Sequence, residues 1–266
     1  MKKNKTVGLA LGSGGFRGFA HIGVIRSLEK HGISVDFISG SSIGAWVGAY
    51  YSLFKDINKL EEDLTANPRE NMLLLFDLSW GGGIVSGQKF SAFLEKNLKD
   101  KNFSDAQIPM KILATDIASG QPYIFDSGPV AQAVRASTSL PLIFKPVNFR
   151  AKVLVDGGLS NPVPGNLVKE MGADIVISVN LYHKNEFIKQ KFSTAQVVMR
   201  CGRIGLYNLA HMAVKDADIV ITPDISIYAE KNGLEQYFDK KIADDIIKIG
   251  EKAADKLIPQ IKALLK

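Results

Sequence analysis

The sequence predicts an α/β protein with three layers, in which helices cover both faces of a mostly parallel central sheet. Short, continuous apolar runs recur along the 266 residues, and such runs are typical of parallel strands that are buried on both faces. Stretches with apolar residues at helical spacing separate most of these runs. Strands that alternate with helices favour parallel pairing through helical crossovers, so the alternation predicts this fold class.

The first strand and the first helix are expected on either side of a glycine cluster. The run TVGLAL at residues 6–11 is the strand, and it ends where the glycines begin. Residues 18–31 form the helix, and Gly32 stands where a C-terminal glycine would end it. The apolar positions of the helix recur every third residue: Phe19, Ile22, Ile25 and Leu28.

A second unit of the same kind follows at once. Residues 35–39 are a short apolar strand, residues 40–44 a turn, and residues 45–53 a helix built from small and apolar residues. Further strands are expected at 110–116, 122–125, 153–155, 174–179 and 218–221. Helical stretches separate them, so the pattern continues along the chain.

One internal segment, residues 66–88, follows neither pattern. It combines Pro68, the apolar run MLLLF, Trp80 and consecutive glycines at 81–83. Long irregular insertions often carry function, so the segment could be a mobile lid. An ordinary surface excursion that packs its own apolar run is an equal alternative.

The C-terminal stretch, residues 240–266, carries an apolar stripe at helical spacing. The stripe consists of Ile242, Ile246, Ile249, Ala253, Leu257, Ile261 and Leu264. Pro259 should kink or break this helix, because proline lacks the N–H that a helix interior uses. We expect the stripe to pack on the sheet, although lysines flank it and a helix lying on a membrane surface would look similar.

The whole chain is expected to fold as one domain. A chain of this length buries about three quarters of its unfolded surface, so it needs neither disulfides nor metals for stability. Its 46% hydrophobic and 23% charged residues are those of an ordinary globular protein. We therefore expect a single domain over residues 1–266, with a core at about 6–218 and a C-terminal helical segment at about 235–266.

Charge and cysteine content narrow the partners and the compartment. The net charge of +6 is scattered through helices, so no nucleic-acid partner is expected. Cys201 is the only cysteine, which excludes an internal disulfide and a cysteine-rich zinc site and fits a reducing cytoplasm. Neither a metal nor a cofactor is expected. No apolar run approaches the roughly 20 residues that span a bilayer, which leaves peripheral contact as the expected relation to a membrane.

Residues 40–44, GSSIG, match the nucleophile-elbow pattern G-x-S-x-G with Ser42 at its centre. In such an elbow, a sharp strand-to-helix turn holds the serine in a strained, exposed position. Gly40 and Gly44 flank it, because a side chain there would collide with the neighbouring strand or helix. Matches of this length also arise by chance, and Ser41 and Ser42 could simply cap a helix. The strand before the turn and the helix after it favour a nucleophile.

The glycine loop GSGGFRG runs from Gly12 to Gly18, between the first strand and the first helix. Its backbone N–H groups could bind a phosphate or the oxyanion of a tetrahedral intermediate. A dinucleotide-binding loop would need a glycine where this chain has Arg17, and an acidic partner after the second strand that is lacking. A Walker loop is excluded, because no glycine-lysine-serine or glycine-lysine-threonine ending occurs.

Asp156 lies in VLVDGG, where a strand ends in an aspartate followed by Gly157 and Gly158. Active sites of open parallel sheets gather at the carboxyl ends of strands, where the glycine loop, Ser42 and Asp156 would all lie. For this tripeptide alone, an aspartate that caps a turn is the simpler interpretation.

A serine triad would need one of the four histidines. The chain order Ser42, Asp156 and then His183 or His211 would suit an α/β-hydrolase, so this alternative stays open. Against it, those enzymes place the nucleophile after several strands, whereas Ser42 follows only the second. The other two, His21 and His31, lie on the first predicted helix, where a lone histidine is more often structural.

The three motifs, in this order, resemble those of the patatin-like phospholipase family. The glycine loop, the elbow and the late DGG carry the likeness, and ATDIASG and ASTSLP extend it from about Thr6 to Asp218. The chain is similar in particular to small bacterial members with little beyond the catalytic domain. The resemblance implies a Ser-Asp dyad without histidine, in which Ser42 is the nucleophile and Asp156 the base that activates it.

The resemblance also implies an oxyanion site in the glycine loop, where Gly14 and Gly15 would supply N–H groups. Arg17 matches the family's basic position and would fix the conformation of the loop or favour negative charge. Ser13 is a departure, since many members have another glycine there, and it leaves the first oxyanion donor open.

The expected function is a serine lipid acyl hydrolase, namely a phospholipase, lysophospholipase or esterase that works through a covalent acyl-enzyme. Its expected partner is a lipid or acyl-ester substrate. A non-catalytic lipid-binding or regulatory protein on the same fold is the main alternative. Acyl transfer to an alcohol or a second lipid is another, because no motif separates it from hydrolysis.

Overall fold

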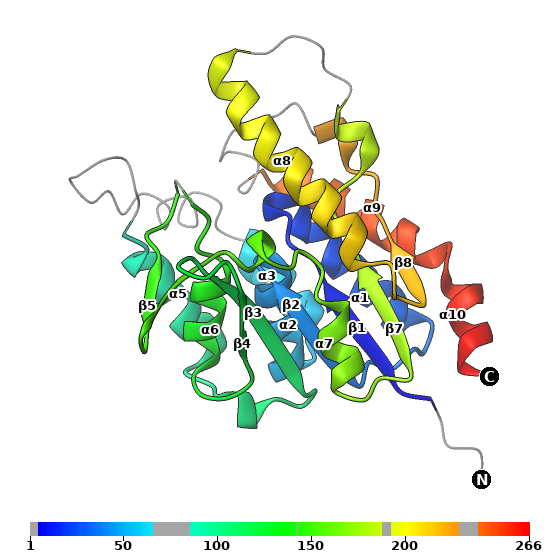
Figure 1. Cartoon of the computed structure of the whole chain (residues 1–266). Helices are drawn as coiled ribbons and strands as arrows, with labels where there is room; N and C mark the ends of the chain where they lie inside the picture. Colours follow the sequence, from blue (N-terminus) through cyan, green and yellow to red (C-terminus); the bar gives the residue numbers. More distant parts are fainter. Residues whose placement is uncertain (1–4, 66–85, 142, 188–192, 229–238) are drawn as a thin grey trace.

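The computed structural model covers the chain, and the structure is described for residues 5–65, 86–141, 143–187, 193–228 and 239–266 (Figure 1). The segment that the sequence singles out as a candidate lid, residues 66–88, lies outside the described residues except for its last three.

A mixed sheet of eight strands forms the middle layer of the described structure (Figure 1). Hydrogen-bonded neighbours follow the order β5-β6-β3-β2-β1-β7-β8, and β4 pairs with β3 beside this path. The parallel pairs join β3 (Met110–Asp116), β2 (Phe37–Ser41), β1 (Val7–Leu11), β7 (Ile175–Val179) and β8 (Ile219–Ile221). The antiparallel pairs add β4 (Pro122–Phe125), β6 (Lys152–Val155) and β5 (Val147–Phe149).

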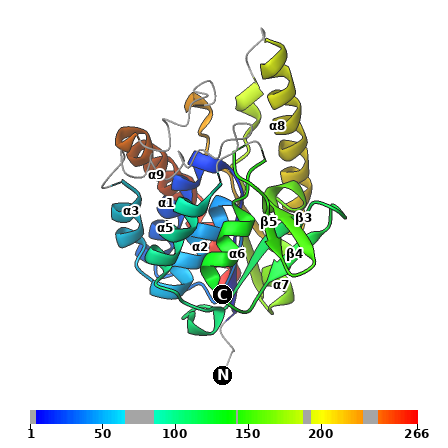
Figure 2. The same cartoon turned by 90° about the vertical axis from the view of Figure 1, so that its left-hand side faces the viewer.

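Helices cover both faces of the sheet, as the side view in Figure 2 shows. One face carries α1 (Phe19–Lys30), α2 (Ile43–Phe54), α3 (Ile57–Thr65), α5 (Gln88–Leu98), α6 (Val130–Ser137), α9 (Lys240–Asp255) and α10 (Ile258–Leu265). The other carries α7 (Gly165–Glu170) and α8 (Thr194–Ala213). The predicted fold class is confirmed: the fold has three layers, with a mostly parallel sheet in the middle and helices on both of its faces. Within the described ranges, no helix is both long and apolar enough to cross a membrane.

The apolar runs of the central strands are continuous because both faces of these strands are covered. All residues of β1 and β7 are buried. In β1, Leu9 and Leu11 pack in the larger core with α1 and α2, whereas Ala10 packs in a second core with α7 and α8. Alternate residues of a strand point to opposite faces, so a strand between two helical layers has no position that faces solvent.

The sheet departs from the expected pattern at one end. The strands expected at 122–125 and 153–155 are present as β4 and β6, but each pairs antiparallel with β3 instead of following a helical crossover. Strand β5 is not predicted from the sequence. It forms a hairpin with β6 around Arg150, whose φ is 53°, and its middle residue Asn148 is exposed. A strand of three residues with an exposed asparagine in the middle leaves no apolar run to detect.

The C-terminal apolar stripe packs into the core. Ile242, Ile246 and Ile247 of α9 are buried, and a Cβ atom on Gly23 of α1 would lie 1.9 Å from the carbonyl oxygen of Ile247. The backbones of α1 and α9 therefore touch, so the stripe packs chiefly against α1 and not directly on the sheet, where it was expected, and it does not face a membrane. Pro259 stands in the first turn of α10, just after α9 ends, which confirms the predicted break.

Candidate active site

The three sequence motifs meet at the carboxyl ends of the parallel strands. The glycine loop follows β1, and Ser42 follows the neighbouring β2. Asp156 follows β6, which runs opposite to β3 yet ends at the same edge of the sheet. It does so because the only residues of β3 with which β6 pairs are Thr115 and Asp116, the last residues of that strand.

Ser42 has a strained backbone at the turn between β2 and α2. Its φ is 55° and its ψ is −125°, a combination that residues with a side chain rarely adopt. The Ser42 N–H donates a hydrogen bond of 2.8 Å to Ser137 Oγ, which donates to the carbonyl oxygen of Leu113 at 2.6 Å. These two bonds tie the turn to α6 and β3 and hold the strained residue in place.

Close packing explains the two glycines of the elbow. A Cβ atom on Gly40 would lie 2.5 Å from the Cα atom of Ala45, and one on Gly44 would lie 2.1 Å from the carbonyl oxygen of Leu11. Both neighbours are backbone atoms, which cannot move without shifting a helix or a strand. The collision that the sequence analysis expects at these two positions is therefore present in the structure.

The other motif glycines let the three loops approach one another. A Cβ atom on each would lie within 2.1–2.7 Å of another segment, namely Gly12 by Val179, Gly18 by Ile43, Gly157 by Leu113 and Gly158 by Ser13. These neighbours come from β7, α2, β3 and the glycine loop, so the glycines sit where the elements of the site converge.

Asp156 contacts Ser42 directly. Ser42 Oγ donates a hydrogen bond of 2.5 Å to Asp156 Oδ2, and the Gly158 N–H donates one of 2.8 Å to Asp156 Oδ1. The Asp156 backbone is held as well, because its N–H donates to the carbonyl oxygen of Ser139 and its carbonyl oxygen accepts from Thr115 Oγ1. The carboxylate is thus fixed in orientation on both of its oxygens.

Burial sets the electrostatics of this carboxylate. Asp156 is 4% exposed, and removal from water raises its pKa from 3.8 to about 6. The hydrogen bonds from Ser42 and Gly158 favour the charged form and limit the rise. Asp156 therefore remains mostly a carboxylate at neutral pH, but it binds a proton more readily than an ordinary aspartate does.

The glycine loop leaves two N–H groups available. The Gly12 N–H donates a hydrogen bond of 3.1 Å to the carbonyl oxygen of Val179, and the Ser13 N–H donates one of 2.8 Å to that of Pro162. Within the part of the chain that the structure describes, the amides of Gly14 and Gly15 donate no hydrogen bond. The amide of Ser13, left open by the sequence, is thus used inside the protein, whereas those of Gly14 and Gly15 are available to a ligand.

Arg17 braces the glycine loop. Its Nε donates a hydrogen bond of 3.0 Å to the carbonyl oxygen of Gly14, and its guanidinium lies 4.8 Å from the centre of the Tyr182 ring. The Tyr182 hydroxyl shares a hydrogen bond of 3.0 Å with Ser13 Oγ. Of the two roles considered for Arg17, these contacts favour fixing the conformation of the loop.

The contacts of the histidines are with residues other than Ser42 and Asp156. His183 faces Asp224, with 3.4 Å between Nδ1 and Oδ1, and the exposed His211 stacks on Tyr207. No histidine is hydrogen-bonded to Ser42 or Asp156, and all four lie in the described ranges. The geometry therefore gives no support to the triad alternative. The described residues also contain no cluster of His, Cys, Asp or Glu that could hold a metal ion.

Sequence reasoning missed Arg135, which lies next to the site. Arg135 is 7% exposed, and it donates to Ser139 Oγ at 2.7 Å and to the carbonyl oxygens of Lys145 and Ser86 at 3.3 and 3.4 Å. Burial lowers its pKa to about 10, so it stays charged. This buried cation joins three segments beside Asp156. Its position directly before ASTSLP was the available signal.

His21 is a second residue whose place the sequence did not reveal. It is fully buried, and its Nε2 donates a hydrogen bond of 2.7 Å to the carbonyl oxygen of Gly12. Burial lowers its pKa to about 4, so the ring is neutral at neutral pH. His21 is structural, as expected for a lone helix histidine, but what it supports is the start of the glycine loop.

Known proteins share these motifs. A family model described as patatin-like phospholipase matches residues 9–167, which include the glycine loop, Ser42 and Asp156. An uncharacterized NTE family protein of Mycobacterium tuberculosis is 34% identical over 176 residues, covering 66% of this chain and 49% of that protein. A lysophospholipase of Aspergillus fumigatus is 32% identical over 181 residues, covering 66% of this chain and 12% of that protein. The chain thus matches less than half of the length of these relatives.

The fold also has a solved counterpart. VipD from Legionella pneumophila aligns with a TM-score of 0.64 and 13% identity, over 97% of this chain and 67% of that chain. At such low identity, this likeness shows the fold alone. The family model covers more than half of the sequence and the order of its motifs is intact, so this chain belongs to the patatin-like phospholipase family.

Proposed function

We propose that this protein is a serine acyl hydrolase that cleaves lipid-like esters, with Ser42 as the nucleophile and Asp156 as its general base. The observation that carries the proposal is the 2.5 Å hydrogen bond from Ser42 Oγ to Asp156 Oδ2 at a strained elbow. A serine hydroxyl is a weak nucleophile and needs a base within hydrogen-bond reach. Here that base contacts the hydroxyl directly, so no histidine is required between them.

The reaction follows from these positions. Asp156 accepts the hydroxyl proton while Ser42 Oγ bonds to the ester carbonyl carbon, and a tetrahedral oxyanion forms. The leaving alkoxide takes that proton as its C–O bond breaks, and the acyl group stays on Ser42. A water molecule then gives a proton to Asp156 and attacks the acyl-enzyme. Ser42 Oγ recovers the proton when the fatty acid departs.

The amides of Gly14 and Gly15 are the proposed donors to the oxyanion. Neither donates a hydrogen bond among the described residues, and both belong to a loop that Arg17 braces. Such donors act on charge that develops only in the transition state, and losing one typically costs about 100-fold to 1000-fold in rate. Because the loop is held before substrate arrives, little reorganisation is needed during the reaction.

The raised pKa of Asp156 suits it to this role. An aspartate with the usual pKa is a weak base, and general bases work best when their pKa lies near the working pH. Burial brings the pKa of Asp156 to about 6. It therefore accepts the serine proton more readily than an exposed aspartate and is still ionised at neutral pH.

Two observations support a lipid-like substrate. One relative carries the name lysophospholipase. In addition, apolar side chains flank the dyad, since Leu159 follows the DGG motif at 44% exposure and Leu140 follows Ser139 at 37%. Exposed leucines beside a nucleophile offer contacts for an acyl chain. The lone Cys201 supports a reducing cytoplasm as the compartment.

The test compares turnover of a short-chain p-nitrophenyl ester by three single variants. Ser42→Ala and Asp156→Ala should each lose at least about 100-fold, because each removes one member of the nucleophile and base pair. Ser41→Ala is the matched control, since this neighbouring hydroxyl is buried and makes no hydrogen bond within the described residues. Unchanged turnover in the Ser42 or the Asp156 variant would contradict the dyad.

The turnover assay and an analysis of its products separate the alternative functions. A folded wild-type protein that binds lipid but turns over no ester would be a binding module on this fold. Product analysis with and without an alcohol acceptor separates transfer from hydrolysis, because both begin from the same acyl-enzyme. Transfer that outruns hydrolysis would replace the proposed reaction with acyl transfer.

A further inference from the structure

Helix α8 is much longer than the strands that it connects. It begins after the carboxyl end of β7 and leads back to β8, which pairs parallel with β7. Its 20 residues extend about 30 Å, whereas the 5 residues of β7 extend about 17 Å. The end of α8 is the part that packs on the sheet, because Ala210 and Val214 share a core with Val176. The first half of the helix therefore extends past the carboxyl edge of the sheet, as Figures 1 and 2 show.

One face of α8 exposes apolar side chains to solvent. Val198 is 67% exposed, Met212 63%, Val197 45% and Ile204 44%. The spacing of these residues, together with the exposed Cys201, Gly205 and Asn208, places them on one side of the helix. Single exposed apolar residues are normal, but a continuous apolar helix face marks an interaction surface. We call Val197, Val198, Ile204 and Met212 the α8 apolar face.

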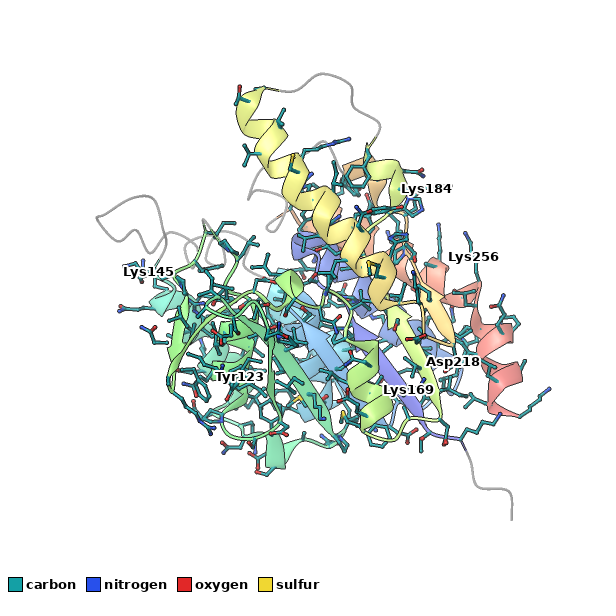
Figure 3. The ribbon with its side chains drawn as sticks, in the orientation of Figure 1. Tyr123, Lys145, Lys169, Lys184, Asp218 and Lys256 are labelled. Atoms are coloured by element: carbon teal, nitrogen blue, oxygen red, sulfur yellow. The ribbon has the colours of Figure 1, made fainter. Side chains whose placement is uncertain are left out.

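The part of this face that Val197, Val198 and Ile204 form lies toward the end of the molecule that carries the candidate active site, whereas Met212 lies on the half of α8 that packs on the sheet. Ser42, the glycine loop and the overhang of α8 all lie beyond the carboxyl ends of parallel strands. The short helix η4 (Lys184–Phe187) packs beside α8, where Arg200 lies over the Phe187 ring at 5.0 Å, and Figure 3 shows Lys184 on its outer side. Ile227, 70% exposed, follows β8 at the same edge. Apolar and basic groups thus lie beyond the same edge of the sheet, together with the acidic Asp224, which pairs with His183.

We propose that the α8 apolar face docks this protein on the surface of an anionic phospholipid membrane, an inference that rests on the proposed lipid hydrolase function. An apolar helix face with cations and no acidic residue is the pattern of helices that lie in the lipid interface. Helix α8 contains Arg200 and Arg203 and no Asp or Glu, and the chain has a net charge of +6. Anionic lipid head groups would attract both the arginines of α8 and the positive net charge of the whole chain.

The charge also argues against a second copy of this chain as the occupant. Pairing two α8 faces would bring two molecules of net charge +6 together, with Arg200, one turn before Ile204, at the margin of each contact. Like charges in such a contact repel, whereas an anionic bilayer attracts them. Because the first half of α8 projects beyond the carboxyl edge, docking through it would keep that edge near the membrane, where Ser42 could meet a lipid ester.

The test is vesicle co-sedimentation of the full chain with a matched pair of double variants. Val197→Glu with Val198→Glu puts charge on the face, whereas Val197→Leu with Val198→Leu keeps it apolar in the same helix. We expect wild type and the leucine variant to bind vesicles of phosphatidylcholine and phosphatidylglycerol in equal parts. The glutamate variant should bind at least about tenfold more weakly, because buried apolar area and charge attraction drive such binding.

Three further readings make the outcome decisive. All of these proteins should turn over a soluble short-chain ester equally, which shows that the variants fold. Ser42→Ala should bind vesicles like wild type, so loss of the proposed reaction and loss of docking are measured separately. Equal vesicle binding by the glutamate and leucine variants would overturn the inference. So would a wild-type dimer in light scattering that the glutamate variant converts to a monomer, since the face would then be a subunit interface.

Discussion

At the scale of single residues, the site rests on a serine and an aspartate that the protein forces into contact. Ser42 is held in a backbone conformation that costs free energy, and the hydrogen bond from its N–H to Ser137 offsets part of that cost. Asp156 is buried, which also costs free energy while it is ionised. Strain and buried charge at one point are what a functional site shows and what an ordinary turn does not.

The pKa of Asp156 predicts how the proposed activity depends on pH. A general base must be deprotonated, so kcat/KM should fall about tenfold per pH unit below a pKa of about 6 and level off above it. Initial rates with a neutral short-chain ester between pH 4.5 and 8 measure this profile. A profile that is flat through pH 6, in protein that stays folded, would contradict Asp156 as the base.

Asp156→Asn should separate activity from stability. The variant removes a buried charge, so at pH 8 its free energy of unfolding should be higher than that of wild type, by up to roughly 3 kcal/mol for a pKa moved from 3.8 to about 6. The folded wild type takes up a proton before the unfolded chain does, so the difference should shrink as pH falls from 6 to 4. Urea unfolding at both pH values measures it. A variant that is less stable than wild type at pH 8 would show that the hydrogen bonds outweigh the buried charge.

At the scale of elements, glycines mark where helices touch other backbones. Gly250 of α9 and Gly205 of α8 both lie inside helices, where alanine is preferred by about 1 kcal/mol. A Cβ atom on Gly250 would lie 2.1 Å from the carbonyl oxygen of Ala20, whereas one on Gly205 has no atom within 4 Å. Alanine is therefore favoured by helix propensity at both positions, but only Gly205 has room for its side chain.

Alanine substitution should act in opposite directions at these two sites. Gly205→Ala should stabilise by up to about 1 kcal/mol, and Gly250→Ala should destabilise by about 1–3 kcal/mol, because α9 must move away from α1. Thermal or urea unfolding of the two variants beside wild type gives both values. Equal effects would mean that α1 and α9 do not cross as closely as described.

His21 links α1 to the start of the glycine loop. His21→Phe should lower the free energy of unfolding by about 1–3 kcal/mol at neutral pH, because the buried carbonyl oxygen of Gly12 loses its donor. The variant should also lose one pH effect. The pKa of His21 is about 4 when folded and 6.5 when unfolded, so it contributes stability above pH 6.5 that is lost as pH falls toward 4. Urea unfolding at pH 7 and pH 5 measures this effect. If acid lowered the free energy of unfolding of wild type and variant equally, a buried neutral His21 ring would be contradicted.

At the scale of the whole molecule, the order of the central elements could be predicted because each carries its own local pattern. The runs that became β1, β2, β3 and β7 are mostly apolar and almost entirely buried, since helices cover both faces of the sheet. The break at Pro259 is likewise local. These local patterns do not show whether two strands pair parallel or antiparallel. Strands β4, β5 and β6 join through antiparallel pairs, and this depends on partners far along the chain.

In the candidate site, too, some residues could be predicted from local sequence patterns and others could not. Ser42, Asp156 and the glycine loop stand in recognisable motifs, and the structure brings them together at one edge of the sheet. Their catalytic roles stay predictions. Arg135, Ser137 and His21 could not be assigned roles from the sequence alone, because their importance comes from hydrogen bonds to Ser86, Ser42 and Gly12, which the fold brings near them. Local patterns show which residues carry chemistry but not which residues hold them.

The most direct test of the central claim is to map where a covalent serine probe reacts. A fluorophosphonate needs an activated serine, and its adduct can be located by mass spectrometry of peptides from the labelled protein. We expect a single adduct on Ser42 in wild type and in Ser41→Ala, none in Ser42→Ala, and strongly slowed labelling in Asp156→Asn. Labelling of another residue, or of Ser42 at an unchanged rate without the Asp156 carboxylate, would contradict the Ser42 and Asp156 pair.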